Sequence, residues 1–187
     1  RDSKEVESEL ITSIYLAPVD GETLPFAAAG QYISIRTEVP GQEYLMNRQY
    51  TVTAASDTEY RISVKRESDA NPVGTVSSFL HDAEVGAMID VSAPAGVFTL
   101  DAGNAPALFI SGGVGVTPLH TMLKSMTDRK ASFIQCARNA GVAAFTESIQ
   151  AKVAALGGNF KAVYSDTDGY VTKETIEAAL DYIELNS

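Results

Sequence analysis

The sequence predicts two folds in one chain: an antiparallel β-barrel or sandwich, followed by an α/β unit built on a parallel sheet. In the first half, short runs of alternating hydrophobicity, rich in β-branched and aromatic residues, are separated by turn signals such as Asp20-Gly21. In the second half, continuous apolar runs alternate with helical patterns, which is typical of parallel strands joined by crossover helices. The change comes near residue 103, so we expect one unit over residues 1–103 and another over residues 104–187.

The first unit is expected to contain six short strands and one helix. The expected strands cover residues 10–16, 31–39, 49–54, 60–66, 88–93 and 97–100. The helix is expected over residues 75–81, because Ser and Thr residues open it.

The second unit is expected to alternate strictly between strands and helices. The expected strands cover residues 107–111, 132–137 and 159–164, and the helices cover residues 117–126, 143–156 and 172–180. Thr172 is the expected N-cap of the last helix, and Glu174 in its first turn suits the positive end of the helix dipole.

Composition limits the partners that this chain can have. Its 187 residues include 14 basic and 24 acidic side chains, giving a formal charge of −10. Such a surface repels phosphate backbones and anionic lipids, so we expect neither nucleic acid nor a membrane as partner. Cys136 is the one cysteine and there are two histidines, so we expect no disulfide and no metal site, and a reducing, cytoplasmic compartment.

The strongest local motif is ISGGVGVTP, residues 110–118, which follows an apolar strand and opens a helix. Its glycines let the backbone approach a pyrophosphate, and the free amides at a helix start favour negative charge. Pro118 suits the first helical turn. The spacing is not GxGxxG, so the usual dinucleotide fingerprint does not apply, and a tight turn without a ligand remains an alternative.

Two further motifs lie in the first half. Arg48-Gln49-Tyr50-Thr51 enters a strand, where a Tyr can lie flat on an aromatic ring system and an Arg can bind a phosphate with two hydrogen bonds. GTVSSFLH, residues 74–81, is a Gly-led turn into a short helix whose first amides can hold a second phosphate. Taken alone, the first motif is better explained as an ordinary barrel rim and the second as a capped helix.

The order of the motifs resembles the ferredoxin–NADP reductase superfamily. The matching segments are RQYT at 48–51, VKRE at 64–67, GTVSSFLH at 74–81, PAGVF at 94–98 and GGVGVTP at 112–118. Within that superfamily, GQY at 30–32 and ARN at 137–139 are most similar to the reductase part of bacterial flavohaemoglobins. The resemblance implies an antiparallel Greek-key barrel that binds FAD, followed by a parallel three-layer α/β domain that binds NAD(P)H.

The resemblance also implies which residues bind the cofactors, with Tyr50 against the isoalloxazine ring and Thr117 near the nicotinamide. Lys65 and Arg66 alternate along one strand, so one of them can face the flavin phosphates while the other stays solvated, and the alternation does not decide which. The FAD contacts implied are Tyr32, Arg48, Gln49, Tyr50, Thr51, Lys65, Gly74, Val76 and Ser77. Those implied for the nicotinamide nucleotide are Gly112, Gly113, Val114, Gly115, Val116, Thr117 and Pro118. Tyr50 and Thr117 are the candidates for a catalytic role.

In the family reaction that the resemblance implies, electrons pass from NAD(P)H through FAD to the haem of an upstream globin domain, which consumes nitric oxide and oxygen. The haem belongs to that globin, which this sequence lacks. Two alternatives stay open: a free-standing flavin- or ferredoxin-type reductase, and a non-catalytic fragment with the same fold.

The two ends of the sequence differ from a complete protein of that family. The chain starts without Met and ends before the Cys-Gly-Pro strand of the family, so we expect a piece of a longer polypeptide with a truncated sheet. The strand over residues 107–111 would then be an open edge that seeks a partner strand, for example in a dimer.

Four other residues carry weaker signals. We expect Cys136 to be a small buried residue, His120 to be a packing or surface residue, and His81 to have a structural role at the end of its helix. Arg138 follows the second parallel strand, where it can meet a 2′-phosphate or remain an ordinary surface arginine.

Overall fold

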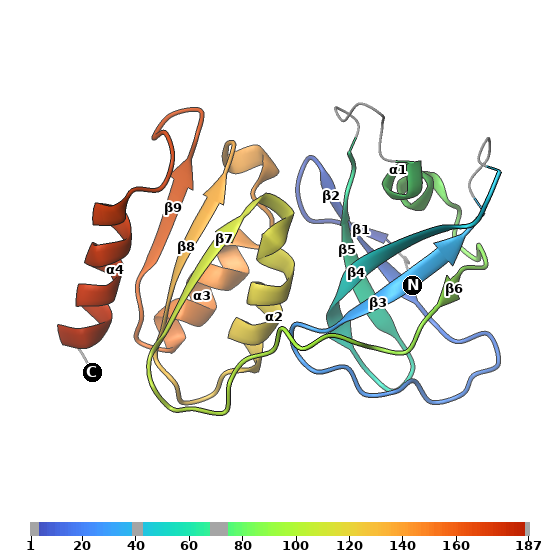
Figure 1. Cartoon of the computed structure of the whole chain (residues 1–187), viewed down its shortest axis with the longest axis horizontal. Helices are drawn as coiled ribbons and strands as arrows, with labels where there is room; N and C mark the ends of the chain where they lie inside the picture. Colours follow the sequence, from blue (N-terminus) through green and yellow to red (C-terminus); the bar gives the residue numbers. More distant parts are fainter. Residues whose placement is uncertain (1–3, 39–42, 68–74, 186–187) are drawn as a thin grey trace. The chain divides into compact units, whose positions relative to one another are not determined.

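The computed structural model describes residues 4–38, 43–67 and 75–185 and divides into two compact units, Arg1–Thr99 and Leu100–Ser187 (Figure 1). Each unit has its own sheet and its own buried cluster of hydrophobic residues. Within the described ranges, no helix has both the length and the apolar character that crossing a membrane requires.

The first unit is a six-stranded antiparallel sheet in the order β1-β2-β5-β4-β3-β6, which confirms the predicted barrel class. Its strands are β1 (Lys4–Val6), β2 (Ile11–Leu16), β3 (Tyr32–Thr37), β4 (Met46–Ala55), β5 (Tyr60–Lys65) and β6 (Asp90–Val91). The one helix, α1 (Thr75–Asp82), lies within one residue of its expected bounds. Strand β1 was not predicted, because three residues are too few to show a period.

Strand β4 bends the sheet. Its first part, up to Thr51, pairs with β3, and its last part, from Val52, pairs with β5. The register shifts between Val52 and Ala54, as a β-bulge does when it turns a strand. The sheet therefore curls around a core of Ile14, Ile33, Ile35, Val52, Tyr60, Ile62, Val64, Val76 and Leu80.

The strand predicted over residues 97–100 is wrong. The chain after Gly96 forms no ladder, and the Val97 side chain is 98% exposed. Gly96 has a φ of 110°, and the Tyr32 ring lies where a side chain at Gly96 would be. The positive φ at Gly96 turns the chain, so the alternating hydrophobicity of VFTL, residues 97–100, does not form a buried strand. Of the strand predicted over 88–93, only β6 forms.

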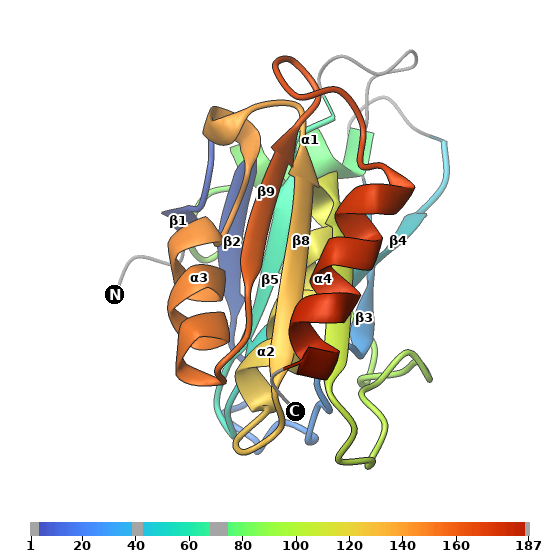
Figure 2. The same ribbon diagram turned by 90° about the vertical axis from the view of Figure 1, so that its left-hand side faces the viewer.

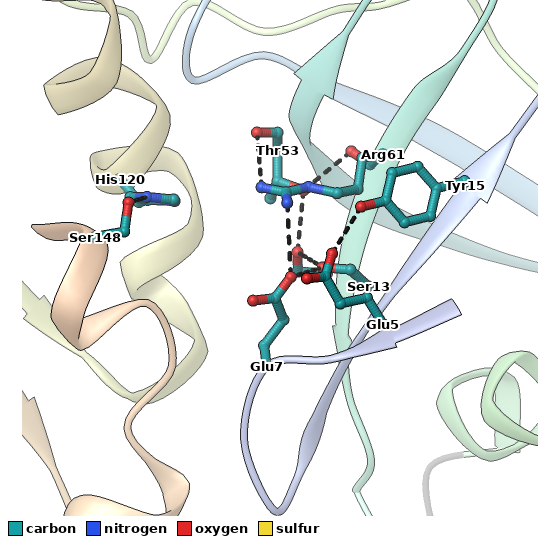
Figure 3. Close-up of polar contacts among 9 residues, drawn as sticks. Glu5, Glu7, Ser13, Tyr15, Thr53, Arg61, His120 and Ser148 are labelled. Atoms are coloured by element: carbon teal, nitrogen blue, oxygen red, sulfur yellow. Dashed lines mark hydrogen bonds and ion pairs between the residues drawn. The ribbon is translucent and has the colours of Figure 1, made fainter. Parts of the chain in front are cut away.

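A polar cluster lies on the opposite face of the sheet from the core. The hydroxyls of Ser13, Thr53 and Ser63 are buried. The Ser63 hydroxyl hydrogen-bonds to Ser13 at 2.8 Å and to Thr53 at 3.0 Å. Ser13 also donates to Glu7, which pairs with Arg61 at 3.6 Å (Figure 3). Because these buried groups have partners, their hydrogen bonds offset the cost of desolvation, and they help to hold β2, β5 and β4 in one register.

The second unit is a three-stranded parallel sheet in the order β7-β8-β9, as predicted. Its strands are β7 (Ala107–Gly112), β8 (Ala131–Ala137) and β9 (Phe160–Tyr164), and its helices are α2 (Val116–Ser125), α3 (Thr146–Ala155) and α4 (Lys173–Leu185). Helices α2 and α3 cover one face and α4 covers the other, which gives three layers (Figure 2). Thr172 caps α4 as predicted, because its hydroxyl accepts a hydrogen bond from the Thr175 amide at 3.3 Å.

Helix α3 begins three residues later than the expected residue 143. The residue before it, Phe145, has a left-handed backbone with a φ of 62°. Its buried ring stacks on His120 at 4.4 Å between ring centroids, and His120 Nε2 hydrogen-bonds to Ser148 at 3.0 Å (Figure 3). This packing stabilises a backbone conformation that costs about 1–2 kcal/mol for an L-residue, and the helical period of the sequence does not reveal it.

Gly158, which precedes β9, has no room for a side chain. A Cβ there would lie 1.7 Å from the backbone carbonyl oxygen of Ala131, so the backbone would have to move. We expect Gly158→Ala to lower the free energy of unfolding by about 1–3 kcal/mol in urea denaturation. Gly115→Ala is the control, because it meets open space at a φ of −60°, and its effect should stay within about 0.5 kcal/mol. Equal effects of the two substitutions would contradict this account.

Candidate functional site

In the first unit, Arg48 and Tyr50 of β4 face the same side of the sheet as the core. They lie opposite Ile35 and Ile33 of β3, and residues opposite each other on antiparallel strands share a face. Both isoleucines are fully buried in the core, and Val76 of α1 packs into the same core. The fold therefore brings Arg48, Tyr50 and helix α1 to one side of the strand pair.

Tyr50 presents a neutral aromatic ring on this side. The ring is half-buried against the core. Desolvation raises the pKa of Tyr50 to about 12, although the positive charge of Arg48 acts to lower it. The phenol therefore stays protonated at neutral pH, so it can pack against a flat ring and also donate a hydrogen bond.

Arg48 and the first turn of α1 together favour an anion. The Arg48 side chain is exposed, and its Nη1 donates to the backbone carbonyl of Asn47 at 2.7 Å. Among the described carboxylates, none forms an ion pair with Arg48. The first turn of α1 carries no acidic residue, so its backbone amides keep their positive partial charge. A guanidinium and a helix start on one side of the sheet suit a phosphate group.

Tyr32, Gln49 and Thr51 lie on the other face of the same strands. Thr51 is opposite Tyr32, and Gln49 is opposite Ser34. The Tyr32 ring covers Gly96, where an added Cβ would be 2.9 Å from the ring. The structure therefore separates the five predicted residues of β3 and β4 into two groups, one on each face.

Two of the remaining predicted flavin residues, Lys65 and Ser77, are linked through Glu67. Lys65 Nζ donates to Glu67 at 3.0 Å and 3.2 Å, and the Glu67 amide donates to the Ser77 hydroxyl at 3.3 Å. The Val76 side chain is buried in the core, so only its backbone can meet a ligand. Gly74 lies outside the described residues.

In the second unit, the glycine-rich loop joins the end of β7 to α2. Gly113 has a φ of 52°, and Gly112, Gly113 and Gly115 are exposed. A Cβ at any of the three would meet no atom of this unit, so a ligand can approach the backbone closely. Gly115 is the N-cap of α2 and supplies no side-chain cap. The Val116 amide already donates to the Gly113 and Val114 carbonyls, and Pro118 has no amide hydrogen, so the glycine backbone before the helix is the part that a ligand can approach.

The side chains that follow the glycines hold the helix start. Val114 is half-buried, whereas Val116 and Thr117 are buried. Thr117 Oγ1 donates to the Val114 carbonyl at 3.0 Å, and Pro118 occupies the first turn. The loop therefore offers its glycine backbone to a ligand, while the Thr117 hydroxyl is engaged within the loop.

Three polar residues at the carboxyl ends of the parallel strands were missed by the sequence reasoning. Ser111 is the second-last residue of β7, and its hydroxyl is buried without a hydrogen-bond partner in the described part of the chain. Beyond β8 and β9, Asn139 Nδ2 donates to Asp166 at 3.1 Å. Their position was the available signal, because ligands of open α/β sheets bind outside the carboxyl ends of the strands.

The environment of Tyr50 predicts its titration. The ionised phenolate is disfavoured in the fold, so Tyr50 should ionise at a pH of about 12 rather than 10.0, and its contribution to stability should be lost as the pH rises through this range. The measurement is the absorbance titration of the protein minus that of Tyr50→Phe. Arg48→Ala should move the transition to still higher pH, since it removes a charge that favours the phenolate. A Tyr50 transition near pH 10 would refute the described burial.

Comparisons with known proteins identify the family of the chain. Residues 11–100 match the family described as "Oxidoreductase FAD-binding domain". The chain is 46% identical over 150 residues to a flavohemoprotein of Pseudomonas putida, covering 78% of this chain and 37% of that protein. It is 42% identical over 174 residues to a flavohemoprotein of Bordetella pertussis, covering 89% of this chain and 43% of that protein. The chain thus spans about two fifths of the length of these relatives.

A solved structure extends the likeness to both units. The flavohem-like FAD/NAD-binding domain of nitric oxide dioxygenase from Vibrio cholerae is 33% identical, with a TM-score of 0.78, and the match covers 91% of this chain and 77% of that one. The match therefore includes both the antiparallel sheet of the first unit and the parallel sheet of the second. The chain belongs to the ferredoxin–NADP reductase superfamily, as an FAD-binding reductase module of the flavohemoprotein type.

Proposed function

We propose that this chain carries electrons from NADH or NADPH, through FAD, to a haem acceptor in the globin part of a flavohemoprotein-type polypeptide. The observation that supports it best is the joint presence of a short helix start beside the barrel, at α1, and an exposed glycine loop before α2, in a sequence 42–46% identical to flavohemoproteins. The same electrons would serve a nitric oxide dioxygenase reaction, the activity named for the Vibrio cholerae relative. A cytoplasmic location belongs to the same proposal.

In this proposal, the side of the barrel that carries Arg48 and Tyr50 holds FAD. Arg48 binds the diphosphate together with the amides of Val76 and Ser77, and Tyr50 packs against the isoalloxazine ring. When bound, FAD supplies the conversion between two-electron and one-electron transfer. Resemblance also assigns Lys65 and Gly74 to the flavin. It further assigns Tyr32, Gln49 and Thr51, whose side chains lie on the other face of β3 and β4.

The glycine loop, residues 112–118, is proposed to bind the nicotinamide nucleotide. The exposed backbone of Gly112, Gly113 and Gly115, where an added Cβ would meet open space, suits its pyrophosphate. Thr117 is proposed to lie near the nicotinamide, and its hydrogen bond to Val114 keeps the loop in one conformation. The loop residues are proposed to bind and orient the nicotinamide nucleotide. Close contact between the nucleotide and the loop backbone would exclude water from the space between them.

Replacing Arg48 tests the flavin site. Arg48→Ala removes a charge-assisted contact, which is worth about 1.5–3 kcal/mol, so FAD affinity should fall about ten- to a hundredfold. The measurement is a flavin fluorescence titration of the apoprotein. Arg36→Ala is a matched control, since Arg36 is an exposed arginine of β3 that points to the other face. Unchanged affinity in Arg48→Ala, or equal losses in both variants, would contradict the proposed site.

The free edge of β7 is proposed as an association site, over residues 107–111. In the described part of the chain, β7 pairs only with β8, and Ile110 is 40% exposed. Such an edge can pair with a strand of a second copy. We expect a concentration-dependent dimer in sedimentation velocity runs, and Ile110→Lys should shift it towards the monomer. A monomer at all accessible concentrations would remove this part of the proposal.

A further inference from the structure

Lys4 of β1 contacts the last turn of helix α1, although it lies 77 residues from His81 in the sequence. Its Nζ donates to the backbone carbonyl of His81 at 2.8 Å and also to the carbonyl of Ala83. Carbonyls at a helix C-terminus lack partners within the helix, and a positive charge there offsets the negative end of the helix dipole. Lys4 thus ties the first strand of the sheet to the end of α1.

Helix α1 depends on such contacts for its position. It has eight residues, a length at which a helix is not stable by itself in water. Two other contacts hold its last turn: His81 Nε2 bonds to the Val64 carbonyl at 2.8 Å, and Arg66 pairs with Asp82 at 2.5 Å. The ion pair is solvent-exposed and contributes little. Lys4 is half-buried and bonds directly to the helix backbone.

We propose that Lys4 is a positioning residue for FAD, which it serves by fixing α1 along its axis; this rests on the flavin site proposed above. Val76 and Leu80 anchor the helix sideways in the core, whereas Lys4 bonds to its end. Lys4 does not touch the diphosphate, because at 1.5 Å per residue the two ends of α1 lie roughly 10 Å apart. Without Lys4, the helix shifts along the core, and its first amides move away from the proposed diphosphate position.

The test compares Lys4→Met, which keeps the length and removes the charge, with Lys4→Arg, which keeps the donors. Lys161→Met is the control, since Lys161 is an exposed lysine of β9 in the other unit. In FAD titrations of the apoprotein, Lys4→Met should raise the Kd about two- to fivefold, the range that corresponds to one charge at a helix end. Lys4→Arg should restore most of the affinity, and Lys161→Met should leave it unchanged.

A phosphorus NMR spectrum of the FAD-saturated protein separates positioning from a general loss of stability. In Lys4→Met, the two diphosphate resonances should move while the visible spectrum of the flavin stays the same. A variant that is only less stable would bind less FAD, yet its bound diphosphate would give unmoved resonances, and that result would overturn the proposal. So would an unchanged Kd in Lys4→Met.

The histidine titration shows whether the contact forms in solution. Burial lowers the pKa of His81, and the charges of Arg66 and Lys4 lower it further, while Val64 and Asp82 act in the opposite direction. Proton NMR should therefore show a higher His81 pKa in Lys4→Met than in Lys161→Met. An unmoved pKa would place Lys4 away from the helix and overturn the inference.

The outcomes also distinguish this inference from the proposed function. If Arg48→Ala leaves FAD binding intact, the flavin site itself is wrong. If Arg48→Ala weakens binding and Lys4→Met does not, only the role of Lys4 is wrong.

Discussion

Strand β4 changes partners halfway along its length, and the organisation of the first unit follows from that change. Up to Thr51 its hydrogen bonds go to β3, and from Val52 they go to β5, with a bulge at the transition. The register before the bulge puts Arg48 and Tyr50 on the core side, where α1 closes the sheet. A slip of one residue in this pairing would move both side chains to the opposite face. The candidate flavin site is therefore a property of strand register.

The two candidate phosphate sites are built in different ways. At the start of α2, the glycine conformation and the preceding parallel strand are local, so the loop keeps its shape through neighbouring residues. Helix α1 is short, and its last turn is held from β1 and β5 by Lys4, His81 and Arg66. A ligand at α1 is consequently sensitive to residues far away in the sequence, whereas a ligand at α2 depends on a few consecutive ones.

Two buried polar side chains of the second unit, Gln135 and Ser111, differ in whether they have hydrogen-bond partners. The Gln135 side chain donates to the Ala144 carbonyl at 2.7 Å and accepts from Thr146 at 3.0 Å, so it stabilises the turn before α3. Ser111 is equally buried, but its hydroxyl has no hydrogen-bond partner in the described part of the chain. It lies at the carboxyl end of a parallel strand, directly before the glycine loop. An unsatisfied buried hydroxyl is costly, and this position is where a ligand is expected.

The sequence by itself determined the fold class, the glycine loop and the cap of α4 at Thr172, because hydrophobic period, glycine conformation and capping depend on neighbouring residues. It also singled out Arg48 and Tyr50, although not the side of the sheet on which they lie. Only the tertiary structure decided which strands pair and that Lys4 contacts α1. It also decided that the exposed segment after Gly96 does not form a strand. These outcomes depend on contacts between residues far apart in the chain, and no local pattern encodes the distance between such residues.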